Sequence, residues 1–171
     1  MPRYYKYKSN YKKVYPRKKW ASNILTMNTL VTLGSGQKSA NSTETLCINS
    51  TQSTTPTPVM IKFGRVKVKG DVRTDIDSNN NYVSGIMYVV FCPQGMTVDQ
   101  FLIDNHPEYI MGWTQISLDS GNTFSFSSSL KRNLNSGDKI AILFLVNSVN
   151  SVQAVRNFNF YYTVQFWTTS A

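Results

Sequence analysis

The first twenty residues concentrate the residue types that bind phosphates and stack on bases. They hold eight Lys or Arg, five Tyr and one Trp, and they hold no Asp or Glu. Cationic side chains neutralise phosphates and aromatic rings stack on unpaired bases, and both interactions tolerate any base sequence. We therefore predict that this segment binds single-stranded nucleic acid through Arg3, Tyr4, Tyr5, Lys6, Tyr7, Lys8, Tyr11, Lys12, Lys13, Tyr15, Arg17, Lys18, Lys19 and Trp20.

This chemistry predicts strong dependence on salt and little discrimination between nucleic acids. Each phosphate neutralised on a single strand contributes about −0.7 to the slope of log affinity against log salt, so eight contacts predict a slope near −6. Single-stranded DNA and RNA both remain open as partners. The run "KKVYPRKK" at Lys12–Lys19 can also act as a nuclear localisation signal. That reading favours DNA slightly and adds a nuclear import receptor as a candidate partner.

The charge of the chain is divided very unevenly along its 171 residues. The formal net charge is +9. Residues 1–20 carry +8 of it, and the first acid in the chain is Glu44. A segment so charged and so poor in aliphatic residues cannot bury enough apolar surface to offset the entropy of ordering it. We expect a disordered basic arm at 1–20, followed by one nearly neutral domain at 21–171.

The domain has the pattern of an all-β protein. Ile24–Leu33 alternates, with Leu25, Met27, Val31 and Leu33 on one face. Phe158–Trp167 also alternates, and its inward residues are expected to be Phe158, Phe160, Tyr162, Val164 and Phe166. Ser84–Pro93 and Ile140–Asn147 are continuously apolar, which is typical of central strands covered on both faces. Weaker or shorter strands are expected at Thr43–Ser50, Trp113–Leu118 and Thr123–Leu130.

A change of phase predicts a β-bulge inside the strand Val59–Val72. Ile61 and Phe63 are apolar at odd positions, whereas Val66 and Val68 are apolar at even positions. A slip of one residue would turn every later side chain to the wrong face, and an extra residue at Gly64 repairs the phase.

One short helix is expected at about Val98–Asn105. Thr97 followed by Gln100 fits a capping box, and the helix must end before Pro107. Seven to nine strands, turn signals between them and a helix in a long loop predict a single eight-stranded jelly-roll β-sandwich.

The sequence offers little for catalysis or metal binding. His106 is its single histidine, and Cys47 and Cys92 fit buried free thiols better than ligands. Asp75 and Asp77 could hold a hard cation, but a solvated turn explains them better. No Rossmann or P-loop pattern, secretory signal peptide or membrane span is present. We expect no enzymatic activity, no metal and no cofactor.

Two further groups of residues each leave two interpretations open. Lys62, Arg65, Lys67 and Lys69 either extend a basic binding surface onto the domain, as an inner surface, or decorate an exposed or edge strand and block aggregation. Tyr161 and Trp167, on the odd face of the last strand, either pack under another layer or make a subunit contact.

The plan of the chain resembles that of circovirus-like capsid proteins, from Rep-encoding circular single-stranded DNA viruses. The basic arm, "IKFGRVKVKGDV" at Ile61–Val72 and "NFNFYYTVQFW" at Asn157–Trp167 carry the resemblance. It covers most of the chain as an order of elements more than as motifs. The arm has more Lys and Tyr than the arginine-dense family pattern, and the body is shorter.

The resemblance implies a structural role. Sixty copies would form an icosahedral shell, with the arms directed inward onto a single-stranded DNA genome, in the virion and in the host nucleus during assembly. The plan is also similar to that of coat proteins of small satellite RNA viruses. A non-viral β-sandwich that binds single-stranded nucleic acid is a further alternative, whereas a lectin-like or cytokine-like jelly roll would leave the arm unexplained.

Overall fold

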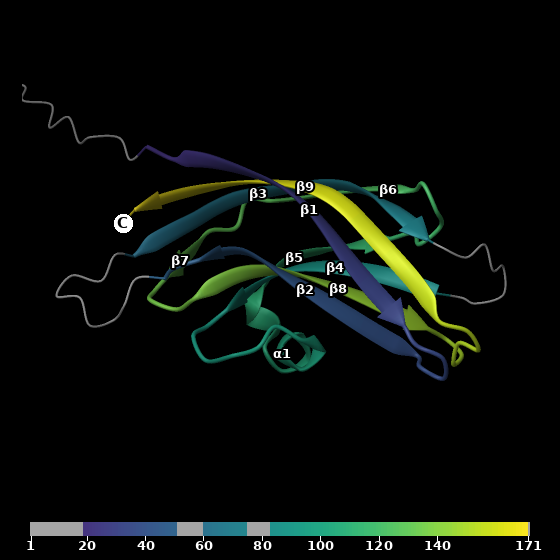
Figure 1. Ribbon diagram of the computed structural model, residues 1–171. Helices are drawn as coiled ribbons and strands as arrows, with labels where there is room; N and C mark the ends of the chain where they lie inside the picture. Colours follow the sequence, from purple (N-terminus) through teal and green to yellow (C-terminus); the bar gives the residue numbers. More distant parts are fainter. Residues whose placement is uncertain (1–18, 51–59, 75–82, 171) are drawn as a thin grey trace, which may run out of the picture.

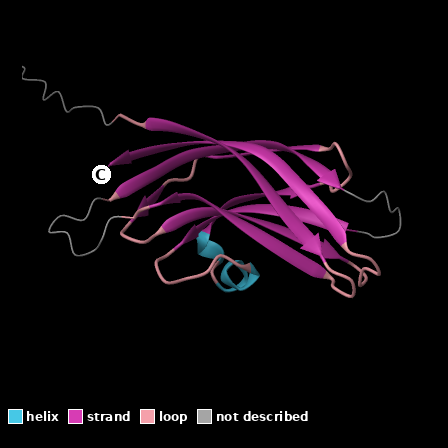
Figure 2. Cartoon of the chain, viewed as in Figure 1, coloured by secondary structure: helices cyan, strands magenta, loops and turns pink. Residues whose placement is uncertain are grey.

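Two antiparallel sheets face each other in the computed structural model, which describes residues 19–50, 60–74 and 83–170 (Figures 1 and 2). The expected disorder of the arm concerns mainly residues 1–18, which lie outside the described residues. Sheet A contains β1 (Ala21–Leu33), β9 (Arg156–Ser170), β3 (Ile61–Thr74), β6 (Thr123–Ser128) and β7 (Arg132–Leu134). Sheet B contains β2 (Ser39–Ile48), β8 (Lys139–Ser148), β4 (Val83–Cys92) and β5 (Ile110–Ile116).

The strand order confirms the predicted eight-stranded jelly roll. Sheet A runs β1-β9-β3-β6 and sheet B runs β2-β8-β4-β5, so that sequence-distant strands are neighbours in both sheets. β6 pairs with Val66–Asp71 of β3, and β7 pairs with Ile61–Phe63 of the same strand. β6 and β7 therefore share one edge of β3 and together take the place of a single strand.

The alternating residues of β9 form the centre of the core, as predicted. Phe158, Phe160, Tyr162, Val164 and Phe166 are all buried. The rings of Phe144 and Phe160 stack across the two sheets with centroids 4.4 Å apart. Apolar side chains at alternate positions of facing strands thus fill the space between the sheets.

β4 and β8 are central strands of sheet B, as their continuous apolar runs predicted. Leu143, Val90 and Cys92 point away from the main core into a second cluster with Leu102 and Ile103. The last two residues belong to α1 (Gln100–Asn105), which lies against the outer face of sheet B (Figure 1). A 3-10 turn, η1 (Pro107–Tyr109), follows it directly.

The helix begins later than the sequence indicated, and the predicted capping box is wrong. The N-cap is Asp99, whose Oδ1 accepts a hydrogen bond from the backbone N–H of Leu102 at 2.8 Å. Thr97 instead donates its hydroxyl to Oδ2 of the same carboxylate, at 3.2 Å. A charged carboxylate is the stronger acceptor for a free helical N–H, and this explains why the cap lies two residues further on.

The predicted bulge lies where the phase change placed it. Phe63 of β3 pairs with Thr168 of β9 and Val66 pairs with Phe166, so Gly64 and Arg65 together face one residue. Phe63, Val66 and Val68 are all fully buried as a result. The bulge keeps the apolar side chains on the core face on both sides of the slip.

Gly70 provides a test of packing around β3 within sheet A. A Cβ at this position would lie 2.5 Å from the Tyr161 carbonyl oxygen and 2.7 Å from Cζ of Phe124. Because β9 backbone cannot move aside cheaply, Gly70→Ala should lower the free energy of unfolding by about 3 kcal/mol. Gly95→Ala, in an open turn at φ +84°, is the control and should cost about 1 kcal/mol. Urea unfolding measures both, and equal losses would contradict the packing argument.

Tyr162 predicts a loss of stability at alkaline pH. Its hydroxyl is hydrogen-bonded to Thr29 Oγ1 at 2.9 Å, and burial raises its pKa from 10 to about 12. The unfolded chain releases this proton first, so stability present below pH 10 is lost as the pH rises toward 12. The expected loss is about 1.4 kcal/mol per pH unit within that window.

Unfolding by urea at pH 9 and pH 11 measures this effect. Tyr162→Phe should flatten the alkaline decline, whereas the exposed neighbour Tyr161→Phe should keep the wild-type dependence. Parallel declines in all three proteins would contradict the role of Tyr162.

Candidate nucleic-acid interface

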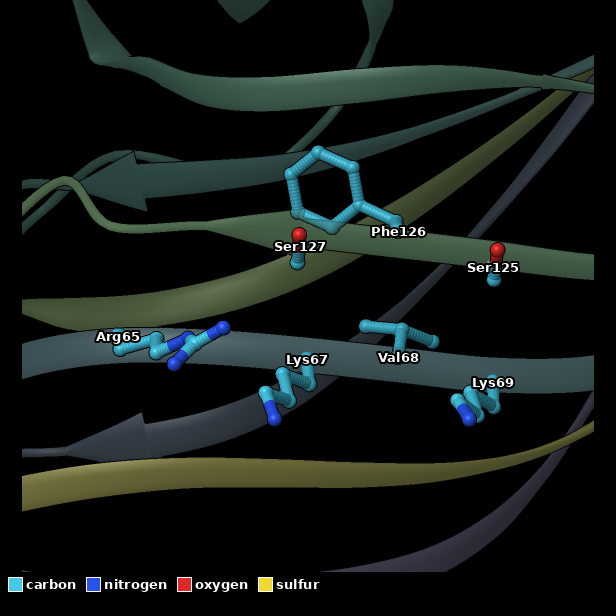
Figure 3. Close-up of a pocket in the computed structure, with 7 residues that line it drawn as sticks. All are labelled: Arg65, Lys67, Val68, Lys69, Ser125, Phe126 and Ser127. Atoms are coloured by element: carbon cyan, nitrogen blue, oxygen red, sulfur yellow. The ribbon is translucent and has the colours of Figure 1, made fainter.

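A row of cations occupies the outer face of sheet A. Because Phe63, Val66 and Val68 fill the core, the residues between them point outward. We call Lys62, Arg65, Lys67 and Lys69, with the surface around them, the cationic face. Figure 3 shows the last three of these side chains in a row along β3, beside β6. Outward residues two positions apart on a strand are about 6.6 Å apart, close to the spacing of phosphates along an extended single strand.

Neutral hydrogen-bonding side chains flank both Lys67 and Lys69. Lys67 pairs with Ser127 of β6 and Gln165 of β9, and Lys69 pairs with Ser125 and Thr163 on the same two strands. Hydroxyl and amide groups beside lysines are common phosphate contacts. The cross-strand register thus surrounds each positive charge with further donors.

The positive charges of the row are not compensated within the described residues. None of the four cations forms an ion pair there. Asp71, further along β3, pairs with Arg73 at 3.0 Å. The Arg73 guanidinium also lies 4.8 Å from the ring centroid of Tyr161. The local acid is therefore already neutralised, and the cations of the row remain available for an anion.

The arm joins the domain at this same face. The ring of Trp20 lies over Gly64, at the bulge of β3. Trp20, Gly64, Arg65, Lys131 and Trp167 line a shallow hollow of about 280 Å³. The arm thus joins the domain, at Trp20, beside the cationic row.

One segment on the opposite side of the sandwich is acidic. Residues 93–116, which include α1 and cover part of sheet B, contain Asp99, Asp104 and Glu108 but no Lys or Arg. The row on β3 therefore places four cations, without ion pairs among the described residues, on one face of the domain, while this segment of the other side holds three acids and no Lys or Arg.

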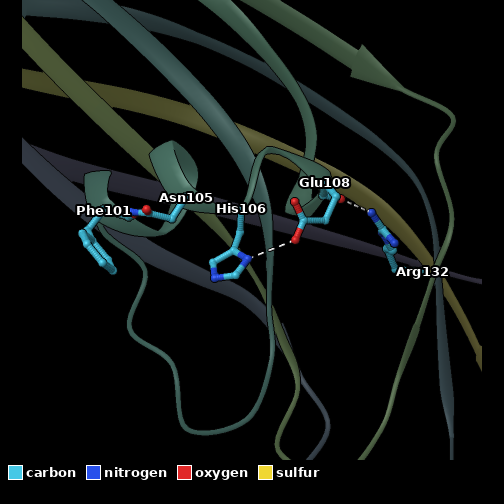
Figure 4. Close-up of polar contacts among 5 residues, drawn as sticks. All are labelled: Phe101, Asn105, His106, Glu108 and Arg132. Atoms are coloured by element: carbon cyan, nitrogen blue, oxygen red, sulfur yellow. Dashed lines mark hydrogen bonds and ion pairs between the residues drawn. The ribbon is translucent and has the colours of Figure 1, made fainter.

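The single histidine lies on that opposite side, in a structural contact. Nδ1 of His106 is 3.0 Å from Oε1 of Glu108, and Arg132 of β7 donates to the Glu108 carbonyl oxygen (Figure 4). A backbone hydrogen bond at Glu108 and then the His106 ring lower the pKa of the Glu108 carboxyl. Asn105 donates to the Phe101 carbonyl at 2.8 Å in the same cluster. These contacts fix the turn after α1 against β7.

The other residues considered as possible ligands or reactive groups are two cysteines and two aspartates. Cys47 is half-buried and Cys92 is buried, both are free thiols, and burial raises the pKa of each. Asp75 and Asp77 lie outside the described residues. Within the described ranges, no three His, Cys, Asp or Glu side chains group as metal ligands, and no helix is long and apolar enough to cross a membrane.

The structure narrows two questions that the sequence left open. β3 lies between β9 and β6, so the idea that its lysines protect a sheet edge is wrong, although they are on an exposed face. Tyr161 and Trp167 also point outward on this face, and no further layer of the described chain covers it (Figure 1). Of the arm residues, only Lys19 and Trp20 are described, and the binding roles of the others stay predictions.

Sequence reasoning missed the residues that surround the row: Ser125, Ser127, Lys131, Thr163, Gln165, and Trp167 as a neighbour of Trp20. Their placement depends on which strands pair with β3. The alternation "TFSFSS" at Thr123–Ser128 was a usable signal for the two serines, since it assigns them to the face opposite the phenylalanines.

Comparison with known proteins does not assign a family. No protein-family model matches the sequence, and no curated protein matches it. Among solved structures, "Desmodium yellow mottle tymovirus" aligns at 13% identity and a TM-score of 0.34, over 92% of this chain and 93% of the other. The decameric BFDV capsid protein aligns at 8% and 0.41, over 90% and 99%. Mud crab tombus-like virus aligns at 10% and 0.40, over 91% and 93%.

Removing two charges from the row tests whether it contacts phosphates. Lys67→Gln combined with Lys69→Gln should weaken binding to oligonucleotides of any sequence and make the salt slope about 1.4 less steep. Lys38→Gln combined with Lys139→Gln removes the same charge away from the cationic face and should leave the slope nearly unchanged. Fluorescence anisotropy over a salt series measures both, and equal slopes for the two double variants would exclude the row as a contact surface.

Proposed function

We propose that this chain is the coat protein of a small icosahedral virus, which forms a closed shell and packages single-stranded DNA. The supporting observation is the asymmetry of charge. Trp20, the last residue of the arm, lies on the same side of the sandwich as Lys62, Arg65, Lys67 and Lys69, while the acidic segment that includes α1 is on the other side. A subunit with this arrangement can direct one face to a polyanion and the other to solvent.

The fold is suited to this role. Jelly rolls are a common architecture of viral capsid and lectin domains. Sugar binding by a lectin does not explain a segment with eight cations in twenty residues. Packaging of a genome does, because the phosphates need dense positive charge around them. The proposal therefore places the cationic face and the arm toward the interior of the shell.

The partners and location follow from the same arrangement. We propose a homo-oligomeric shell of sixty copies, with an expected mass of about 1.2 MDa for a 19.4 kDa chain. DNA is favoured over RNA because the run Lys12–Lys19 fits import into the nucleus, where assembly would take place. The mature protein would then be found in the virion.

The first test is negative-stain electron microscopy of the purified full chain at moderate salt. Uniform closed particles with a native mass near 1.2 MDa are the expected result. If the protein forms only small species across a range of salt and added nucleic acid, the coat-protein proposal fails. A non-viral protein that binds single-stranded nucleic acid would then be the better explanation.

A second test concerns the arm. Replacing its eight Lys and Arg by Gln should remove most nuclease-protected nucleic acid from the particles and leave the thermal unfolding of the domain unchanged. A variant with residues 2–19 in scrambled order keeps the charge and leaves Trp20 in place, and it should still package. Absorbance ratios and protected nucleic acid per particle measure the effect. Unchanged packaging by the neutral arm would contradict the proposed role.

A further inference from the structure

The hollow where the arm meets the domain combines aromatic surface with positive charge. Trp20 and Trp167 line it together with Arg65, Lys131 and Gly64. Trp167 pairs with Ser22 of β1, and Trp20 directly precedes β1, so the two indoles come from adjacent parts of sheet A. Arg65 and Lys131 are both exposed. This is the combination of groups that binds a single nucleotide, with a ring for the base and cations for the phosphate.

The absence of a side chain at Gly64 makes the hollow possible. A Cβ there would lie 2.7 Å from Cζ3 and 3.1 Å from Cη2 of Trp20. The backbone of Gly64 is not in the left-handed region, so the fold does not need glycine for its conformation. The site uses the small size of this residue, since any side chain would push the indole away.

The break between β6 and β7 supplies the second cation. Lys131 lies in that break, opposite the bulge of β3, and its Nζ is 5.6 Å from the centroid of the Trp20 ring. Arg65 is the bulged residue next to Gly64 and continues into the row formed by Lys67 and Lys69. Neither Lys131 nor Arg65 forms an ion pair among the described residues.

Trp20 is held in place without being covered. It retains 39% of its surface exposed although it packs on Gly64. An indole that served only to attach the arm would gain by complete burial, because burying aromatic surface is favourable. The hollow that Trp20 lines also contains Arg65 and Lys131, so an anionic ligand with a planar ring would be attracted there.

We infer that Trp20, Trp167, Arg65 and Lys131 form a nucleotide subsite for single-stranded nucleic acid. An unpaired base stacks on the exposed indole surface, and the adjacent phosphate pairs with Arg65 or Lys131. The strand then continues along Lys67 and Lys69, so the subsite joins the arm to the cationic face. This inference depends on the nucleic-acid binding of the proposed function and adds a base-dependent component to it.

The test compares two single strands of equal charge. The full chain, freed of nucleic acid at high salt, is titrated at moderate salt with a thymidine 15-mer and with an abasic deoxyribose-phosphate 15-mer. Wild-type protein should prefer the thymidine strand, and Trp20→Ala should reduce that preference about 5- to 10-fold. The salt slope should stay the same because no cation is removed.

Two further variants separate stacking from attachment. Gly64→Ala should reduce the preference in the same direction by displacing the ring, and Trp20→Phe should keep part of it. Trp113→Ala, in which a 60% exposed tryptophan is removed from β5 of sheet B, is the matched control and should change nothing. A lower melting temperature with an unchanged preference in Trp20→Ala would show that Trp20 only attaches the arm, and would overturn the inference.

A fluorescence measurement keeps the test decisive if Trp20→Ala does not fold. The chain has three tryptophans, and Trp113→Phe leaves only Trp20 and Trp167 to fluoresce. Thymidine strands should quench their emission more than abasic strands at equal saturation, and equal quenching would overturn the inference. If the wild-type protein binds neither strand, the proposed function itself fails, which is a different result.

Discussion

The extra residue of β3 at Gly64–Arg65 determines how the rest of sheet A is arranged. Without it, Val66 and Val68 would point to solvent and Lys67 and Lys69 would enter the core, at a cost of several kcal/mol for each buried charge. With it, every apolar residue of β3 faces inward and a row of cations faces outward. The same irregularity lies opposite the break between β6 and β7 and leaves the space that Trp20 occupies.

The two faces of the sandwich are stabilised in different ways. The outer face of sheet B is covered by α1, which buries Leu102 and Ile103 against Leu143. The outer face of sheet A remains uncovered in the described residues and carries like charges along one strand. Those charges repel one another, so the isolated domain bears an electrostatic cost that a polyanion would relieve. Binding on that face would therefore stabilise the fold as well as the complex.

Sequence patterns were sufficient for elements whose residues alternate strictly. β9 and the bulge of β3 followed from periodicity alone, because each side chain has only two faces available to it. The start of α1 did not follow, since Thr97, Asp99 and Gln100 offered competing caps whose choice depends on local geometry. β7 has three residues and no pattern of its own, and only its pairing with β3 defines it.

The site could be predicted only in part for a similar reason. The lysines of β3 were evident as an outward row, but their neighbours depend on long-range pairing that no local pattern encodes. Ser125 and Ser127 reach the row because β6 pairs with β3, and Trp167 reaches Trp20 because β9 pairs with β1. Composition identified the arm as cationic and aromatic, whereas the register determined which surface of the domain it meets.

The central position of β9 in sheet A has a consequence for biosynthesis. β9 lies between β1 and β3, so neither of those strands can complete its hydrogen bonding until Arg156–Ser170 has left the ribosome. In a nascent chain, β1 therefore stays without its partner strand until β9 has been synthesised, which is for most of translation. Products truncated before β9 cannot assemble the cationic face, so a shell built from this fold would exclude incomplete chains by their inability to close the sheet.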